Sequence, residues 1–320
     1  MIVRWGLREL PGLLAELEIE RPFLIASERW SDLDVPSAGR WSEVPSHRID
    51  EIAAAVESAD GLLAVGGGSA IDLAKAVSAA TGLPVVSVPT TYAGAEWASN
   101  FGIRDNDRRM QGGGTGANLA GIVYDPDLTL GLPLEVTVGT AMNALAHCAE
   151  ALYVKGRTPE ADVLALEGAR TINEALPKVV AFPDDRQART KLLAGADVAG
   201  HALGIAGLGL GHAMAQAVGG RYGLPHGALN AICLPPALRF NEPVAGAEIA
   251  RFAEALGTDE PIGRVQELAL LGGFKRLRDL GVPEKDLEEL GNLAAQRGGA
   301  KANPRPATPA EVAALLRSVW

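Results

Sequence analysis

The sequence has little cysteine and no excess of positive charge, and each shortage excludes a class of protein. Its 320 residues include only two cysteines, Cys148 and Cys233, which lie far apart and outside any CxxC pair. They support neither a disulfide scaffold nor a cysteine-based zinc site, and a reducing cytoplasm is the expected compartment. Acidic residues outnumber basic ones by 39 to 29, and the net charge of −10 opposes binding to nucleic acid or to an anionic membrane.

Long uninterrupted apolar segments are also scarce. The first ten residues contain Arg4, Arg8 and Glu9, so no secretory signal is expected there. The least charged stretch, residues 194–220, is long enough to test as a membrane span, but it is mostly glycine and alanine and includes Asp197. We therefore expect it to form buried helices and no membrane span.

The chain does have enough apolar material for a core, and its pattern changes along its length. Hydrophobic residues make up 48% and charged residues 21%, which is typical of a globular protein, and 320 residues favour two domains. Strands are expected at residues 23–26, 61–65 and 85–88, and helices at residues 11–18, 49–58 and 71–80. This alternation predicts a parallel sheet covered by helices. Helical patterns dominate after Pro133, so we expect an α/β domain over residues 1–133 and an all-helical domain over residues 134–320.

A glycine-rich turn follows the strand expected at residues 61–65. Its residues are Gly66, Gly67, Gly68 and Ser69. Glycines allow a ligand to approach the backbone closely, and the N–H groups that begin a helix attract a pyrophosphate. In this interpretation Ser69 can cap the helix, and a cap is also the structural alternative for Asp72. The spacing matches neither GxGxxG nor a P-loop, so a tight turn remains an alternative.

Two other loops follow predicted strands at the same edge of the sheet. Glu28 comes just after the strand at residues 23–26, where a carboxylate can bind a ribose 2′-hydroxyl and repel a 2′-phosphate. Glu28 therefore favours NAD over NADP, although a solvated surface carboxylate is the alternative. Thr90 and Thr91 follow the strand at residues 85–88. We expect the three loops to converge on one crevice.

Three of the five histidines have informative positions. Asn143 and His147 are four residues apart and therefore share a helix face, and His212 and Gln216 repeat this spacing. His226 follows in a turn-like segment. Neutral imidazole is the commonest metal ligand and an acid at physiological pH, so the group indicates a metal site or a proton-relay site, with core packing as the alternative.

Several motifs in order resemble the iron-containing alcohol dehydrogenase superfamily, which includes maleylacetate reductases. The similarity covers nearly the whole chain. Its segments are GGGSAIDLAKAV (66–77), VPTTYAGAE (88–96), VYDPDLTLGLP (123–133), MNALAHCAEALY (142–153), GLGHAMAQAVGGRYGLPHGALNAICLP (209–235) and NPRPATPAEVAALLRSVW (303–320). The resemblance implies a dinucleotide-binding α/β domain and an all-helical domain, as in dehydroquinate synthase-like proteins, with nicotinamide and substrate between them.

The resemblance also assigns roles to residues. It implies that the glycine turn holds the pyrophosphate, with Asp72, Thr90 and Thr91 nearby. In metal-dependent relatives one aspartate and three histidines bind Fe²⁺ or Zn²⁺. Those positions correspond here to Asn143, His147, His212 and His226. The asparagine resembles the maleylacetate reductase branch, which is regarded as metal-independent, whereas GLPHGALN resembles the alcohol dehydrogenase branch.

Two departures from the family pattern bear on the substrate. Gln216 replaces a histidine that is usual one helical turn after the position of His212. The stretch at residues 104–121 lacks an expected lysine, although Arg108 or Arg109 can supply positive charge and clamp a carboxylate.

The leading hypothesis is an NAD(P)H-dependent oxidoreductase that transfers hydride to a small unsaturated or keto acid. It resembles maleylacetate reductase of aromatic-compound catabolism, with His147, His212 and His226 as the catalytic residues. One alternative is a metal-dependent alcohol dehydrogenase that acts on a small alcohol or aldehyde. Others are a lyase that uses NAD transiently and a non-catalytic dinucleotide-binding protein. A homodimer is expected from general frequency.

Overall fold

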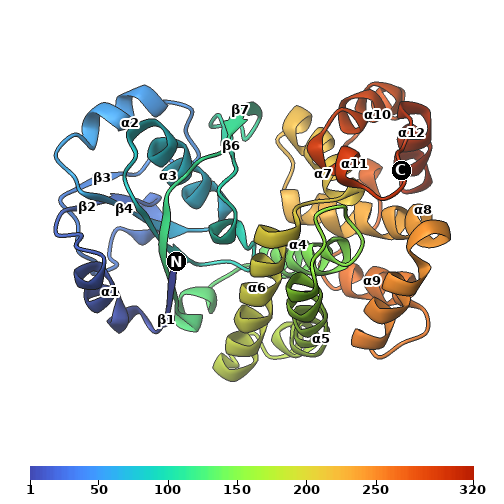
Figure 1. Ribbon diagram of the computed structural model, residues 1–320, viewed down its shortest axis with the longest axis horizontal. Helices are drawn as coiled ribbons and strands as arrows, with labels where there is room; N and C mark the ends of the chain where they lie inside the picture. The colour runs from blue at the N-terminus through green and yellow to red at the C-terminus, as the bar shows by residue number, and fades with distance from the viewer. The chain divides into compact units, whose positions relative to one another are not determined.

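The computed structural model describes residues 1–320, and the chain forms two compact units. The first, here called the α/β unit, comprises Met1–Thr91 and Ala95–Gly131. The second, the helical unit, comprises Tyr92–Gly94 and Leu132–Trp320. All the strands belong to the first unit, and the long helices in green to red belong to the second (Figure 1).

A parallel sheet lies at the centre of the α/β unit, as predicted, and its six strands follow the order β1-β8-β5-β4-β2-β3. Its strands are β1 (Ile2–Trp5), β2 (Pro22–Ile25), β3 (Gly39–Trp41), β4 (Gly61–Gly66), β5 (Val85–Pro89) and β8 (Leu119–Tyr124). Every residue of β2, β4 and β5 is buried, which is why these strands are continuous apolar runs in the sequence. They are the three predicted strands.

Helices cover both faces of this sheet. They are α1 (Leu10–Glu16), α2 (Ile49–Ala55) and α3 (Gly68–Thr81). Side chains of α1 pack with Leu63 and Val86 on one face, whereas α2 and α3 pack with Leu62 and Val85 on the other. Successive strand residues point to opposite faces, so each buried strand contributes to both cores.

A two-stranded antiparallel hairpin of β6 (Phe101–Arg104) and β7 (Met110–Gly114) lies against α3. The sequence pattern does not predict this hairpin. Lys75 of α3 anchors the segment that leads into β6. Its buried ammonium donates to the carbonyls of Ala95, Ala98 and Asn100 at 2.8, 3.1 and 2.7 Å.

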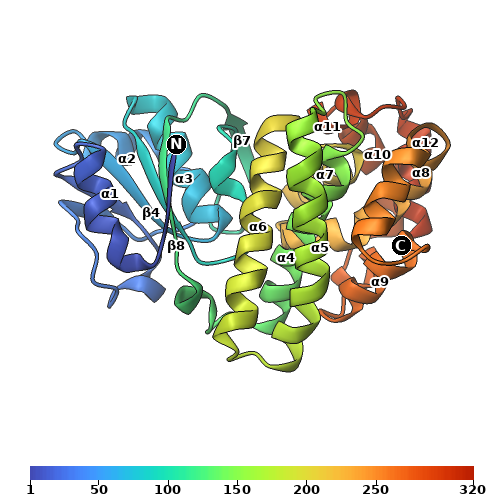
Figure 2. The same cartoon turned by 60° about the horizontal axis from the view of Figure 1, so that its bottom comes forward.

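The helical unit is all-helical, as predicted. Its helices are α4 (Leu134–Ala151), α5 (Pro159–Ala181), α6 (Arg186–Ala206), α7 (Leu210–Tyr222), α8 (His226–Ala255), α9 (Pro261–Leu270), α10 (Leu287–Ala295), α11 (Gly298–Ala302) and α12 (Pro309–Ser318). Helix α4 is buried along most of its length, because it packs against α5, α6 and α8 (Figure 2). Its residues therefore reach the interior of the unit from one rigid element.

Residues 194–220 fall in α6 and α7, and most of their side chains are buried. No single helix is long and apolar enough to cross a membrane. Only α6 and α7 taken together pass that test of length and composition, and they are bent by 99° at the break between them.

Candidate active site

The glycine turn lies at the carboxyl end of β4, where the sequence placed it. Gly66 has a φ of +152°, and a Cβ there would lie 2.8 Å from the Cβ of Ala70. A Cβ on Gly67 would lie 2.9 Å from Cγ2 of Thr91. Helix α3 begins at Gly68 and its N-cap, Gly67, makes no side-chain cap hydrogen bond. The turn is therefore a close-packed cradle whose helical N–H groups suit a phosphate group of a dinucleotide.

The capping roles expected for Ser69 and Asp72 are wrong, because the N-cap of α3 is Gly67. Ser69 lies inside the first turn of α3 and does not cap it. The Asp72 carboxylate lies 2.8 Å from Nζ of Lys75 and accepts a hydrogen bond from the N–H of Gly102 at 3.2 Å. Asp72 therefore fastens the β6–β7 hairpin to α3.

The structure brings the three predicted loops to one edge of the sheet, because β2, β4 and β5 are adjacent and parallel. The N–H of Thr90 donates to the carbonyl of Gly66 at 3.0 Å, so the loop after β5 is joined to the glycine turn. Thr91 follows it and packs on Gly67. Glu28 is exposed in a short 3-10 helix, Glu28–Trp30, just beyond β2.

The arginines proposed as a carboxylate clamp lie at the turn of the β6–β7 hairpin. Arg108 and Arg109 are exposed, and their backbone N–H groups donate to Asp105. Arg104 is the more buried arginine of this hairpin. Its pKa is lowered by burial, although Asp72 nearby raises it.

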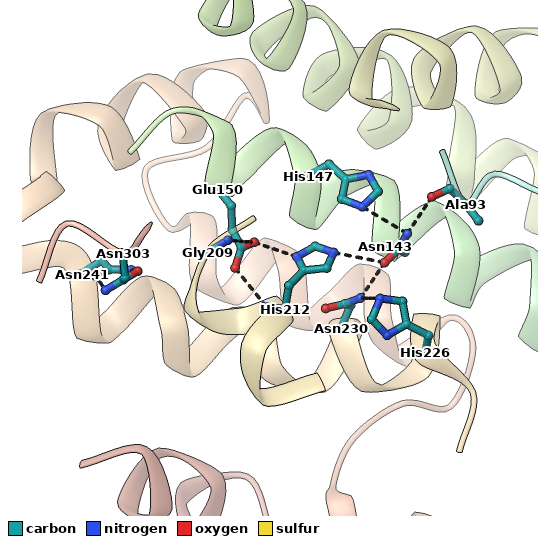
Figure 3. A network of polar contacts seen from close by, with 10 residues as sticks. All are labelled: Ala93, Asn143, His147, Glu150, Gly209, His212, His226, Asn230, Asn241 and Asn303. Atoms are coloured by element: carbon teal, nitrogen blue, oxygen red, sulfur yellow. Dashed lines mark hydrogen bonds and ion pairs between the residues drawn. The ribbon is translucent and has the colours of Figure 1, made fainter. Parts of the chain in front are cut away.

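A buried polar network in the helical unit contains all four residues predicted as metal positions (Figure 3). Helix α4 supplies Asn143 and His147, α7 supplies His212, and α8 supplies His226 and Asn230. Asn143 lies at the centre, with its side-chain nitrogen 3.3 Å from Nε2 of His147 and its oxygen 3.2 Å from Nε2 of His212. Nδ2 of Asn230 lies 3.0 Å from Nε2 of His226.

The orientation of the Asn143 amide is fixed by its neighbours. Its Nδ2 donates to the carbonyl of Ala93 at 2.8 Å, and a carbonyl can only accept. Its Oδ1 accepts from Nδ2 of Asn230 at 2.5 Å. The nitrogen of Asn143 therefore faces His147 and its oxygen faces His212.

The imidazole rings lie close together. The rings of His147 and His212 are stacked, with centroids 4.8 Å apart, and those of His212 and His226 are 5.7 Å apart. Burial lowers the pKa of His147 well below its usual range, and the positive charge that His212 and His226 can carry lowers it further. His147 is therefore neutral near pH 7. His226 is half-buried, whereas the other two rings are buried.

Sequence reasoning missed two members of this network. Glu150 is completely buried on α4, and its carboxylate lies 2.7 Å from Nδ1 of His212. Asn230 follows His226 by four residues, which is the spacing of Asn143 and His147, and this repeated spacing could have revealed it. Gln216 shares α7 with His212, whereas the ring of His212 contacts Glu150 and Asn143.

The donor chemistry of the network disfavours a strongly bound iron or zinc ion. A cation needs lone pairs of the imidazole nitrogens. Nε2 of His147 instead faces the amide nitrogen of Asn143, and Nε2 of His226 faces that of Asn230. No three His, Cys, Asp or Glu side chains form a metal-binding cluster. These two ring nitrogens are therefore engaged by amide groups, whereas Nδ1 of His147 and Oδ1 of Asn230 are buried without a hydrogen-bond partner.

Two family models match the chain. Residues 6–120 match "Iron-containing alcohol dehydrogenase", and residues 137–320 match "Fe-containing alcohol dehydrogenase family, C-terminal". A maleylacetate reductase of Pseudomonas knackmussii is 35% identical over 330 residues, which cover 98% of this chain and 93% of that protein. A maleylacetate reductase of Burkholderia cepacia is 37% identical over 263 residues, which cover 82% of this chain and 74% of that protein.

Solved structures agree with these matches. An iron-containing alcohol dehydrogenase from Corynebacterium glutamicum has a TM-score of 0.89 and 32% identity, covering 100% of this chain and 94% of that one. The maleylacetate reductase from a Rhizobium species has a TM-score of 0.89 and 29% identity, covering 100% and 95%. The chain belongs to the iron-containing alcohol dehydrogenase family, and it is an NAD(P)-dependent oxidoreductase that acts on a small molecule.

Proposed function

We propose that this enzyme reduces a small unsaturated keto acid of the maleylacetate type with NADH, and that it does so without a resident metal ion. Residues 1–133 bind the dinucleotide, and residues 134–320 carry the catalytic histidines. The names of the relatives that are 35–37% identical support this substrate class.

The observation that carries the metal-free proposal is the position of Asn143. Its neutral amide contacts His147, His212 and Asn230 at once. An aspartate there would add the negative charge that helps to hold a divalent cation, whereas the amide donates and accepts hydrogen bonds in one fixed orientation.

The reduction needs one hydride and one proton. Bound NADH supplies the hydride from C4 of its nicotinamide ring. The proton that completes the new C–H bond comes from the protein. We assign its transfer to His226, because it is the half-buried member of the histidine group.

His212 lies at the centre of this group, and hydrogen bonds hold its ring at both nitrogens. Its Nδ1 faces Glu150 and its Nε2 faces Asn143, and both facing atoms are oxygens that can only accept. An N–H on either ring nitrogen of His212 therefore has an oxygen acceptor. His147 stays neutral and accepts from Asn143.

The three loops at the sheet edge bind the dinucleotide. The turn at Gly66, Gly67, Gly68 and Ser69, with Thr90, Thr91 and Asp72 close by, holds the pyrophosphate. The exposed carboxylate of Glu28 at the end of β2 is placed to accept a ribose 2′-hydroxyl and to repel a 2′-phosphate, so NAD is preferred to NADP.

We further propose that the enzyme is a cytoplasmic homodimer. Both cysteines are buried and unpaired, as in proteins of a reducing compartment. Symmetric dimers are the commonest soluble oligomers.

The test measures NADH consumption and substrate conversion together. Purified enzyme with maleylacetate and NADH should consume one NADH per substrate, and His226→Ala and His212→Ala should each lower turnover by about 100-fold or more. His47→Ala, at an exposed position of the α/β unit, is the matched control and should retain full activity.

Other outcomes contradict the proposal. Substrate conversion without net loss of NADH would indicate a lyase. NADH binding without turnover on a panel of unsaturated and keto acids would indicate a dinucleotide-binding protein. Full turnover by His226→Ala and His212→Ala would remove both residues from the mechanism.

A further inference from the structure

Glu150 is a fully buried carboxylate whose role the mechanism above leaves open. It lies on α4, one helical turn after His147, and its exposed fraction is 0%. Its carboxylate lies 2.7 Å from Nδ1 of His212. A buried carboxylate is costly unless it is paired and hydrogen-bonded, so the surrounding residues must stabilise it.

The start of α7 forms a cradle for this carboxylate. A Cβ on Gly209 would lie 2.9 Å from Cδ of Glu150, and a Cβ on Gly211 would lie 2.9 Å from its Oε1. Any larger residue at either position would displace the carboxylate or the helix. The Gly209-Leu210-Gly211 sequence therefore leaves space for Glu150.

Three N–H groups donate to the two carboxylate oxygens. Oε2 accepts from the backbone N–H of Gly209 at 2.6 Å and lies 2.7 Å from Nδ1 of His212. Oε1 accepts from the backbone N–H of His212 at 3.1 Å. Because a carboxylate only accepts, Nδ1 of His212 carries a hydrogen, and the opposite nitrogen, Nε2, faces Asn143.

We propose that Glu150 is a positioning residue, which holds the ring of His212 with Nδ1–H toward itself and Nε2 toward Asn143. Its effect on catalysis rests on the proposed function, since it requires that His212 take part in the reduction. A charge-assisted hydrogen bond in a dry interior fixes both the rotation and the protonated nitrogen of the ring. Partners that orient a functional histidine in this way typically contribute about 10- to 100-fold to activity.

A simpler role would be that Glu150 only caps α7, because it also accepts two backbone N–H groups at the start of that helix. The two roles differ in what happens to His212. If Glu150 only caps α7, its replacement lowers the stability of that helix. If Glu150 positions His212, its replacement changes the orientation and the protonated nitrogen of the imidazole ring.

The first variant is Glu150→Gln. An amide offers one acceptor and one donor, so it cannot receive the three N–H groups that the carboxylate receives. We expect kcat to fall by about 10- to 100-fold while KM stays within about twofold. Asp185→Asn is the matched control, because Asp185 caps α6 by accepting from the N–H groups of Gln187 and Ala188, and asparagine caps equally well. It should leave both constants unchanged.

The second measurement does not depend on activity. The nitrogen NMR shifts of the His212 ring, in the protein without substrate, report which nitrogen carries hydrogen. In the wild-type protein Nδ1 should be fully protonated, and Glu150→Gln should reduce that protonation. A wild-type ring with unprotonated Nδ1, or a His212 pattern unchanged in the variant, would overturn the proposal.

A double-mutant cycle separates the two roles of Glu150. In a His212→Asn background, Glu150→Gln should reduce kcat by less than about twofold more, because the residue through which it acts is already absent. An equal loss in both backgrounds would show that Glu150 only caps α7. If His212→Asn alone kept full turnover, the proposed function of His212 would fail, and the NMR shifts would still decide the orienting role of Glu150.

Glu150→Asp serves if the glutamine variant does not fold. It keeps the charge but withdraws the carboxylate by one methylene group, so kcat should lie between the wild-type and glutamine values. Wild-type kcat together with a wild-type His212 pattern in this variant would contradict the proposal.

Discussion

Nδ2 of Asn230 donates to Oδ1 of Asn143 at 2.5 Å, and this contact joins α8 to α4 at the centre of the histidine network. Both residues are buried, with exposed fractions of 1% and 4%. The oxygen of Asn143 is therefore already hydrogen-bonded, and the amide nitrogens face the imidazoles of His147 and His226. Nδ1 of His147 and Oδ1 of Asn230, by contrast, are buried atoms without a hydrogen-bond partner.

This relationship predicts that Asn143→Asp converts the network into a metal site. The carboxylate adds a negative charge among three imidazoles and removes the N–H that faces His147. We expect affinity for Zn²⁺ to rise by about 10- to 100-fold, measured by metal analysis after dialysis. Asn292→Asp, at an exposed position of α10, is the control for the added charge. Stoichiometric zinc in the dialysed wild-type protein would contradict this account of Asn143.

The glycine cradle predicts a loss of cofactor binding in Gly67→Ala. The new methyl group would lie 2.9 Å from Cγ2 of Thr91, so the turn or the loop after β5 must shift. Overpacking of this kind costs about 1–3 kcal/mol, and the Kd for NADH should rise about tenfold or more in calorimetric titration. Gly12→Ala in α1 has nothing within 4 Å of the added Cβ and should leave the Kd unchanged. Equal affinities of the two variants would remove the turn from the binding site.

The position of Glu28 predicts the preference between the two dinucleotides. Glu28→Gln removes the charge that repels a 2′-phosphate, so the Kd for NADPH should fall and that for NADH should rise, each by roughly three- to tenfold. Both can be measured by titration of protein fluorescence. Glu20→Gln, an exposed carboxylate at the opposite end of β2, is the matched control. An unchanged ratio of the two Kd values would show that Glu28 is only a solvated surface residue.

The depressed pKa of His147 predicts how stability depends on pH. Burial lowers this pKa in the folded protein, so below about pH 6.5 the unfolded chain binds a proton that the folded chain does not bind. Above that pH, His147 should not change the free energy of unfolding. Below it, the free energy of unfolding should fall with decreasing pH, by up to about 1.4 kcal/mol per pH unit for this proton.

Urea unfolding at about pH 7.5 and about pH 5.5 measures this dependence. His147→Gln should reduce the difference between the two pH values, whereas His47→Gln, at an exposed position, should not. An undiminished difference in His147→Gln would assign the pH dependence to other groups.

The sequence predicted three strands of the sheet and missed the other three. One of these, β8, lies inside the sheet between β1 and β5, and its last four residues are buried. Strands β2, β4 and β5 are covered on both faces, so each is a continuous apolar run. Strand β1 is only partly buried and includes Arg4, and β3 has three half-buried residues. Such short edge strands leave little pattern in a sequence.

In the candidate site, the sequence likewise predicted some residues and missed others. The spacing of Asn143 and His147 was sufficient to place both on one helix face, because helical geometry is local. The partner of His212 was not predictable from the spacing to Gln216, since it depends on how α7 packs against α4. Glu150 has no local signal apart from the glycines of α7, which are distant in sequence and become informative only in the folded chain.

The rate of NADH oxidation with maleylacetate, measured with and without a strong chelator, decides whether the enzyme needs a metal ion. We expect rapid oxidation that the chelator leaves unchanged and that added iron or zinc does not increase. Oxidation that the chelator abolishes, and that iron or zinc restores, would show that Asn143 still permits a catalytic metal and would contradict the proposed metal-free mechanism.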